Sequence, residues 1–285
     1  MKIVASLFFL FIVHSNLFAQ NLEDSNKIDL HVNLVAGDTY FYSTSTKQNI
    51  IQEVMGETIE INQEFTTDFK YFVESNNNNS IKIKATYERI DLLIDSPEDQ
   101  IDYSSSREDS DSRFSMLNNL IGKSFYIFMN TTGKVFDITG FNELTKNMNL
   151  GKFAQQLLTD SSLLRSLNMD IYPDEAIIMG ESWNKTAAFD ISNLKLKNEL
   201  IYTLEGTSED LVWLNLNGKI SGNGTADNFD MDLIGNQSGT IETDLKSGMI
   251  SSSDIKTEIE ATIKSLDLEI PVKVFSETKV SGRKL

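Results

Sequence analysis

Long runs of alternating apolar and polar residues restrict the fold of this chain more than any other feature of its sequence. Ile28–Val35, Ser80–Ile90 and Leu211–Leu216 each place an apolar residue at every second position. Tyr40–Ile51 and Thr58–Val73 are longer and rich in Thr, Ile, Phe and Tyr. Strands of this kind bury one face and leave the other in water, which is typical of antiparallel sheets. The sequence therefore predicts a mainly antiparallel β fold.

Turn signals separate these runs. Asn and Gly tolerate the backbone angles that tight turns require, and they occur at Met55-Gly56, Asn76–Asn79, Asn217-Gly218 and Ser247-Gly248. Two further glycine positions, at Gly222–Gly224 and Gly235, are interpreted as turns or bulges because neither has the context of a phosphate-binding loop. The acidic, Ser-rich stretch Asp95–Arg113 has low hydrophobicity and predicts a mobile surface loop.

Helical spacing is concentrated between about residues 112 and 170. Phe141, Leu144 and Met148 recur at three- and four-residue intervals, and so do apolar residues between Phe153 and Leu158. Asp160–Ser162 supplies an N-cap for a short helix over Leu163–Leu167, and Pro173 returns the chain to extended structure. Residues 141–172 are therefore predicted to form a helical connector.

The part before the connector and the part after it share short matches in the same order. Three pairs of segments correspond: Gly37–Tyr40 with Gly180–Trp183, Asp68–Glu74 with Glu199–Glu205, and Leu120–Val135 with Leu233–Ile250. Each match alone is weak, but the ordered set indicates an internal repeat. We expect an α+β fold, mainly antiparallel β, in which two related β-meander halves, residues 20–140 and 173–285, pack with the helical segment as one structural unit.

The N-terminus has the features of a secretory signal peptide over residues 1–19. Lys2 precedes the apolar run Ile3–Val13, and Ala19 suits the last position before cleavage. The run is too short to span a membrane, and no later segment is apolar enough to do so. We expect an exported protein that is periplasmic or secreted. It is not a lipoprotein, because the chain has no Cys to carry a lipid.

Charge and composition exclude several classes of function. The 25 Lys and Arg against 42 Asp and Glu give a net charge of −17, which argues against nucleic acid as a partner because phosphates are bound by cations. The absence of Cys excludes disulfides and thiolate chemistry. Only His31 is left once residues 1–19 are removed, and no motif assigns it a catalytic role. The sequence indicates no enzyme, no cofactor and no metal site.

Five aromatic residues are the weak candidates for a ligand platform, although packing within strand faces is the more ordinary role of such residues. They are Tyr40, Tyr71, Trp183, Tyr202 and Trp213.

Several of these segments together resemble a known family. Leu30–Leu34 followed by Gly37–Tyr40, the Thr- and Gln-containing run Ser43–Gln48, Tyr87–Ile90, Leu120–Phe125 and Gly180–Trp183 occur in the order expected for domain of unknown function 6263. The resemblance implies an exported, β-rich protein of the Bacteroidetes with no established activity, often a lipoprotein. This chain differs from those lipoprotein members because it has no Cys.

These observations leave three hypotheses for function. The first is a non-catalytic binding module for an unknown, small hydrophobic or lipid ligand, because curved sheets can enclose an apolar concavity. The second is a structural or protein-interaction protein of the envelope. The third is a carboxylate-based hydrolase, which lacks any distinguishing pair of acids among the 42 acidic residues.

Overall fold

A computed structural model describes residues 27–77, 80–146, 148, 163–164, 167–191, 193–226, 229–265 and 268–285. The strands are β1 Thr39–Val54, β2 Glu57–Asn76, β3 Ile81–Asp95, β4 Gln100–Ser104, β5 Ser124–Met129, β6 Val135–Thr139, β7 Ser182–Ile191, β8 Asn193–Thr207, β9 Leu211–Ala226, β10 Phe229–Asp244, β11 Ile250–Ser265 and β12 Leu268–Lys284. Among the described residues, the 3₁₀ helix η3 (Ser112–Leu120) and the α-helix α1 (Phe141–Thr145) accompany them.

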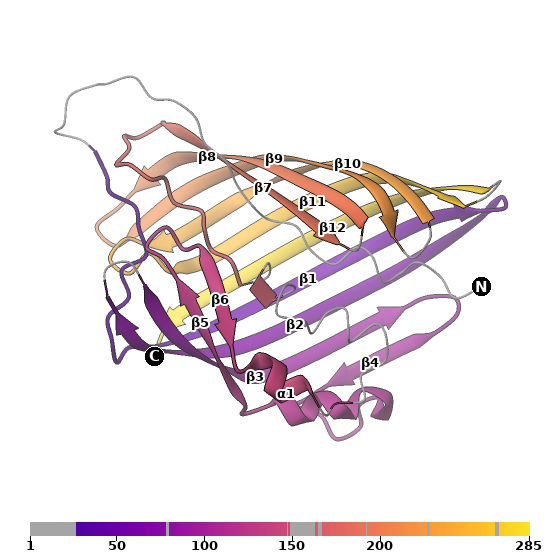
Figure 1. Cartoon of the computed structure of the whole chain (residues 1–285), viewed down its shortest axis with the longest axis horizontal. Helices are drawn as coiled ribbons and strands as arrows, with labels where there is room; N and C mark the ends of the chain where they lie inside the picture. Colours follow the sequence, from indigo (N-terminus) through magenta and orange to yellow (C-terminus); the bar gives the residue numbers. More distant parts are fainter. Residues whose placement is uncertain are drawn as a thin grey trace.

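All twelve strands belong to one open, antiparallel sheet, which confirms the mainly antiparallel prediction. The order across the sheet is β6-β5-β3-β2-β1-β12-β11-β10-β9-β8-β7, and β4 pairs with β3. The first and last strands of the chain, β1 and β12, lie side by side in the middle of the sheet (Figure 1). The expected packing of two separate halves around a central helical segment is not confirmed, because this pairing joins them edge to edge.

The sheet has an inner face and an outer face, which follow from the two-residue period of a strand. On β1 the buried side chains include Tyr40, Tyr42, Gln48, Ile50 and Val54, all at even positions. The cross-strand register carries this face onto β2 at odd positions and onto β12 at even positions. Odd residues of β1, such as Lys47, therefore point to the outer face.

The sheet is strongly curved (Figure 1), and glycines on the inner face of β9 and β10 permit this. A Cβ at Gly218 would lie 2.3 Å from Cδ2 of Leu200, and one at Gly239 would lie 2.3 Å from the carbonyl oxygen of Asp254. The turn predicted at Asn217-Gly218 and the turn or bulge glycines predicted at Gly222–Gly224 and Gly235 are thus wrong. These glycines lie within strands because neighbouring strands approach closely there.

Other turn predictions are confirmed. Met55 and Gly56 have positive φ angles of 54° and 84° and join β1 to β2, as a two-residue hairpin requires. Gly248, with φ of 68°, closes the turn between β10 and β11. Residues 78 and 79 of the predicted asparagine turn lie outside the described residues.

The strand predicted at Ile28–Val35 is wrong. Only Ile28 forms a bridge, to Ile177, and the rest of the segment runs extended across the inner face. Its amides bond to turns instead, Val32 N–H to the carbonyl of Thr131 and Asn33 N–H to that of Ser247. Leu30, Val32 and Leu34 are nevertheless buried. The alternation therefore shows that one side of the segment is buried, and it does not show that the segment belongs to the sheet.

The helical connector is described only in part. Phe141–Thr145 is helical as expected, and Leu167 N–H bonds to the carbonyl of Leu163 in a single helical turn. The predicted helix around Phe153 and Leu158 and its cap at Asp160, like the signal peptide over residues 1–19, lie outside the described residues. The domain boundaries at residues 19, 140 and 172 stay predictions.

The stretch Asp95–Arg113 is not the loop that its composition predicts. It contains β4 and the start of η3. Arg113 donates hydrogen bonds to the carboxylates of Asp99 and Asp111, and Arg107 pairs with Asp102. These two cations offset the acidic charge and allow the segment to fold as an extra strand on β3.

Candidate functional site

The inner face of the sheet carries two apolar clusters at its opposite ends. The larger one, here the closed-end core, contains aromatic residues of the sheet together with segments that are not strands, such as Leu30–Leu34 and Met169–Tyr172. The smaller one, here the aliphatic cluster, contains Ile50, Ile61, Leu196, Leu233 and Val272 among others. The two clusters differ in the elements that form them: non-strand segments contribute to the closed-end core, whereas the described members of the aliphatic cluster all lie on strands. This difference defines the candidate site.

Buried polar contacts fasten the connecting segment over the closed-end core. Trp183 Nε1–H donates to the carbonyl of Ile171 at 2.8 Å, and the Tyr172 hydroxyl donates to the carbonyl of Gly248 at 2.6 Å. Lys185 Nζ lies 2.5 Å from Asp170 Oδ1, with both side chains almost fully buried. This end of the inner face is therefore filled by the chain itself.

Four of the five predicted aromatic candidates lie in this closed-end core, in two cross-strand pairs. Tyr40 is opposite Tyr71, and Trp183 is opposite Tyr202, with the latter two rings stacked at 5.7 Å between centroids. Trp213 lies on the outer face, where its Nε1–H donates to Glu242 at 3.0 Å. The five residues do not form one platform, and a ligand role for any of them stays a prediction.

Burial in the closed-end core raises the pKa of several tyrosines, because it disfavours the charged phenolate. The pKa of Tyr40 rises to about 12, with the nearby Asp38 carboxylate as a second cause. Burial also raises the pKa of Tyr42, Tyr71 and Tyr202. These hydroxyls stay protonated at neutral pH.

The aliphatic cluster is built differently. Every described member lies on a strand, and no described loop or helix contributes to it. Its side chains come from the inner positions of β1, β2 and β8–β12, and they are Ile, Leu, Val, Met and Ala without an aromatic ring among the buried ones. Its buried members are at most 9% exposed, so this part of the inner face is an apolar core formed by the strands themselves.

A row of polar side chains, here the polar belt, separates the two clusters. The register places Gln63 of β2, Gln48 of β1, Ser276 of β12, Thr257 of β11 and Gln237 of β10 side by side. On β9 the next position is Gly218, and on β8 the polar residue is Asn198, one pair further along. The belt, Gln63, Gln48, Ser276, Thr257, Gln237 and Asn198, thus crosses seven strands.

Sequence reasoning did not find the belt. The signal that identifies it is an amide at an otherwise apolar inner position, such as Gln63 between Ile61 and Phe65. An alternating strand predicts burial for that position, and a buried amide is a costly choice unless it has a partner.

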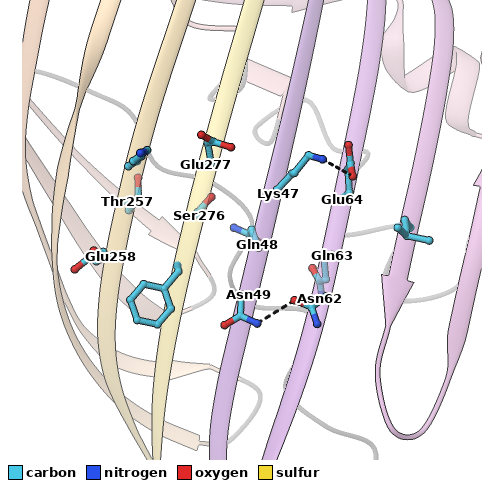
Figure 2. Close-up of a pocket in the computed structure, with 13 residues that line it drawn as sticks. Lys47, Gln48, Asn49, Asn62, Gln63, Glu64, Thr257, Glu258, Ser276 and Glu277 are labelled. Carbon is cyan, nitrogen blue, oxygen red and sulfur yellow. Dashed lines mark hydrogen bonds and ion pairs between the residues drawn. The ribbon is translucent and has the colours of Figure 1, made fainter.

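The outer face carries a shallow depression of about 440 Å³ near the middle of the sheet (Figure 2). Lys47 Nζ pairs with Glu64 at 3.1 Å, and Asn49 donates to Asn62 at 2.9 Å. Exposed Leu93 and Phe275 also line it. The mixture of ion pairs, amides and two apolar side chains is that of an ordinary solvated sheet face with a small apolar spot.

The described residues contain neither a cluster of metal ligands nor a membrane-spanning helix. Within the ranges given above, no three His, Asp or Glu side chains converge as ligands for a metal ion. None of the helices among those residues has the length and hydropathy needed to cross a membrane.

A family model matches residues 78–250, which is more than half of the chain. The model is that of DUF6263, described as a family of unknown function. The chain belongs to this family. The resemblance inferred from the sequence is therefore confirmed, and the matched region runs from the start of β3 to the start of β11. No curated protein matches the chain.

A solved structure shares the fold of this chain at very low identity. This structure, described as showing lipid–protein interactions in lipovitellin, aligns with 88% of this chain at 10% identity and a TM-score of 0.53. The alignment covers 25% of that chain, so this protein spans a quarter of its length. An outer-membrane channel from Pseudomonas putida F1 aligns with 92% of this chain and 100% of its own at 6% identity, with a TM-score of only 0.26. The lipovitellin likeness concerns the fold alone.

Proposed function

We propose that this member of the family is a non-catalytic binding module that holds a hydrophobic small molecule of lipid type on its inner face. The observation that carries the proposal is the aliphatic cluster, an apolar interior built only from strands among the described residues, with buried members that are at most 9% exposed. A hydrocarbon chain that leaves water for such an interior gains roughly 25 cal/mol per Å² of its own surface. A ligand with hydrocarbon chains supplies a suitable counterpart.

The dimensions of the inner face agree with such a ligand. Six residues separate Gln48, in the polar belt, from Val54 at the end of β1. At a rise of about 3.3 Å per residue, this distance is roughly 20 Å. One leaflet of a bilayer's hydrocarbon core is about 15 Å thick, so the aliphatic cluster is long enough for one acyl chain.

The fold likeness adds support of a weaker kind. The lipovitellin structure is described by its lipid–protein interactions, and this chain shares its fold over most of its length. Fold alone does not determine function, which is why the proposal rests on the chemistry of the inner face.

The proposal includes export. The features of residues 1–19 support secretion to the periplasm or beyond, and the absence of Cys excludes a lipid anchor on that residue type. Cell fractionation with an antibody against the chain tests this: we expect the protein in the periplasmic or extracellular fraction, and recovery in the cytoplasm would contradict it.

The binding test uses the uncharged fluorescent probe N-phenyl-1-naphthylamine, whose emission rises in an apolar site. We expect saturable binding to the purified protein and its loss in Ala261→Phe, because Ala261 lies on the inner face within the aliphatic cluster. Thr262→Phe is the matched control, since the next residue of β11 points to the other face. Ala261→Leu is a milder second variant if the first one unfolds.

Two results of this test would contradict the proposal. Unchanged probe binding in a folded Ala261→Phe or Ala261→Leu variant would place the probe elsewhere and contradict the proposal. A wild-type protein that binds no probe, and carries no extractable lipid in native mass spectrometry, would contradict it as well.

A second candidate is a protein-interaction role for the outer face. The observation in its favour is the depression of Figure 2, where Leu93 and Phe275 expose 45% and 42% of their surface. Crosslinking in cells with the wild-type chain and with Phe275→Ser tests this role. It predicts one stoichiometric partner that the variant loses, and a chain that stays a monomer in crosslinked cells would exclude it.

A further inference from the structure

The polar belt lies where the head group of an amphiphile would meet the sheet. On seven strands in succession, the aliphatic cluster lies on one side of the belt and the closed-end core on the other. An acyl chain that inserts among the aliphatic side chains from the far rim meets the belt before it meets the closed-end core, into which the connecting segment is packed. The inference drawn here rests on the proposed binding function and specifies its ligand.

Part of the belt is a hydrogen-bonded chain. Asn198 Nδ2–H donates to Gln237 Oε1 at 3.4 Å, and Gln237 Nε2–H donates to Thr257 Oγ1 at 3.1 Å. These bonds hold the amide of Gln237 in one orientation. The belt is thus a positioned set of groups and not a random scatter of polar side chains.

Two amide atoms of the belt are left over among the described residues. Gln63 Nε2, a donor, and Asn198 Oδ1, an acceptor, have no hydrogen-bond partner, and the two residues are 4% and 0% exposed. Gln52 lies on the inner face of β1, two inner positions beyond Gln48. Its Nε2 also has no hydrogen-bond partner, and the residue is 2% exposed. Buried polar atoms in folded proteins nearly always have partners, so these atoms point to a ligand that supplies them.

The belt is also uncharged. It contains four side-chain amides and two side-chain hydroxyls, and it contains no Lys, Arg, His, Asp or Glu. The amides are those of Gln48, Gln63, Gln237 and Asn198, and the hydroxyls are those of Ser276 and Thr257. The charged inner residue closest to it in the described structure, Lys185 on the neighbouring strand β7, is already paired with Asp170. An anionic head group would find no countercharge in the belt and would lose its hydration.

We propose that the polar belt is a head-group site for an uncharged amphiphile whose head both accepts and donates hydrogen bonds, such as the glycerol ester of a monoacylglycerol. An oxygen of a head group at the β2 end of the belt accepts from Gln63, and the hydroxyl of a head group at the β8 end donates to Asn198, because five strands lie between β2 and β8. The acyl chain lies along the aliphatic cluster. An ionised fatty acid of the same chain length is discriminated against.

The test compares three probes on the full chain: 1-oleoylglycerol, sodium oleate and N-phenyl-1-naphthylamine. The variants Gln63→Leu and Asn198→Leu remove the unpartnered atoms while keeping similar volume. Gln63→Leu is expected to fold at least as stably as the wild type, since an unsatisfied buried amide is replaced by an apolar group. Asn198→Leu also removes the donor to Gln237, so its folding is checked by circular dichroism before binding is measured. Asn62→Leu is the matched control, because Asn62 neighbours Gln63 but lies on the outer face (Figure 2).

We expect each belt variant to weaken 1-oleoylglycerol binding about tenfold, the equivalent of one buried hydrogen bond. Binding of N-phenyl-1-naphthylamine, which has no such head group, is expected to change less than twofold, and Asn62→Leu is expected to behave as wild type. Wild-type protein is expected to bind 1-oleoylglycerol more tightly than oleate.

Two outcomes would overturn the inference and leave the proposed function intact. One is unchanged 1-oleoylglycerol affinity in both folded belt variants, and the other is tighter binding of oleate than of 1-oleoylglycerol while N-phenyl-1-naphthylamine still binds. If none of the three probes binds the wild-type protein, the proposed function itself fails.

Discussion

Lys185 and Asp170 form an ion pair that is almost completely withdrawn from water and that fastens the connecting segment to edge strand β7. Lys185 Nζ lies 2.5 Å from Asp170 Oδ1, and Thr132 Oγ1–H donates to the same oxygen at 2.9 Å. Desolvation makes such pairs a weak net source of stability, whereas the loss of one partner strands a buried charge.

Lys185→Met is therefore expected to lower the free energy of unfolding by about 3–5 kcal/mol, because it leaves the Asp170 carboxylate without its cation. Chemical denaturation measures this change. The double variant Lys185→Met/Asp170→Leu is expected to recover part of the loss, which a double-mutant cycle makes explicit. Lys197→Met is the control: its partner Glu199 is exposed, and such pairs contribute about 0–1 kcal/mol. Equal effects of the two Lys variants would contradict the account.

The buried tyrosines predict a marked loss of stability in alkali. Burial raises the pKa of Tyr42, Tyr71, Tyr87 and Tyr172, and that of Tyr103 rises to about 12. The unfolded chain ionises its tyrosines near pH 10, so it loses protons that the folded chain keeps. The free energy of unfolding is therefore expected to fall as the pH rises above 10, by about 1.4 kcal/mol per pH unit for each such tyrosine.

Absorbance at 295 nm and circular dichroism, recorded together from pH 8 to 12.5, measure this effect. We expect most phenolate absorbance to appear only where the β signal is lost. Tyr42→Phe is expected to reduce the slope of stability against pH above 10. Phenols that titrate near pH 10 in a chain with unchanged dichroism would show that the core is open to solvent.

Two hairpins of the sheet share a local geometry that the sequence match predicts. Gly37 N–H donates to the carbonyl of Val73 at 2.9 Å, and Gly180 N–H donates to that of Leu204 at 2.8 Å. Both glycines have positive φ, 93° and 81°. The third sequence match is reproduced only in part: Gly133 and Gly248 both have positive φ, 88° and 68°, whereas Gly122 lies in a turn and Gly235 lies inside β10.

Gly37→Ala and Gly180→Ala are expected to destabilise the chain by a similar amount, about 1–2 kcal/mol, because an L-residue is strained at these angles although nothing lies within 4 Å of either added Cβ. Thermal denaturation compares the two directly. Asn at either position is expected to be tolerated better than Ala. If one Ala variant were neutral and the other strongly destabilising, the two hairpins would not be equivalent.

Alternation predicted β3 and the start of β9, Leu211–Leu216, because the two-residue period is a local property of the chain, and the content of Thr, Ile, Phe and Tyr predicted β1 and β2. Alternation failed at Ile28–Val35, whose buried side chains contact turns around Thr131 and Ser247 instead of a neighbouring strand. Local pattern reports which side of a segment is buried, and it does not report which element buries it.

The local sequence pattern could not predict the candidate site, for a related reason. Gln48 and Ser276 are neighbours only because β1 pairs with β12, and this pairing joins residues more than two hundred positions apart in sequence. The amides of Gln63 and Gln237 are visible as polar residues in apolar strand faces, but their alignment in one row depends on the register of the whole sheet.

Two glycines inside strands β9 and β10 give the last prediction. An added Cβ at Gly239 would lie 2.3 Å from the backbone oxygen of Asp254 and 2.8 Å from Cα of Ile255, neither of which can move without displacing β11. At Gly218 the atom at 2.3 Å is Cδ2 of Leu200, the end of a side chain that can change rotamer. Gly239→Ala is therefore expected to lower the free energy of unfolding more than Gly218→Ala, within the range of about 1–3 kcal/mol that overpacking costs.

Urea denaturation of the two variants measures the order. The combination Gly218→Ala/Leu200→Ala is expected to cost less than the sum of its parts, because the shorter side chain removes the clash. No equivalent relief is available at Gly239, where the obstruction is backbone. If Gly218→Ala proved the more damaging of the two, the close approach of β10 to β11 would not be what requires glycine in this part of the sheet.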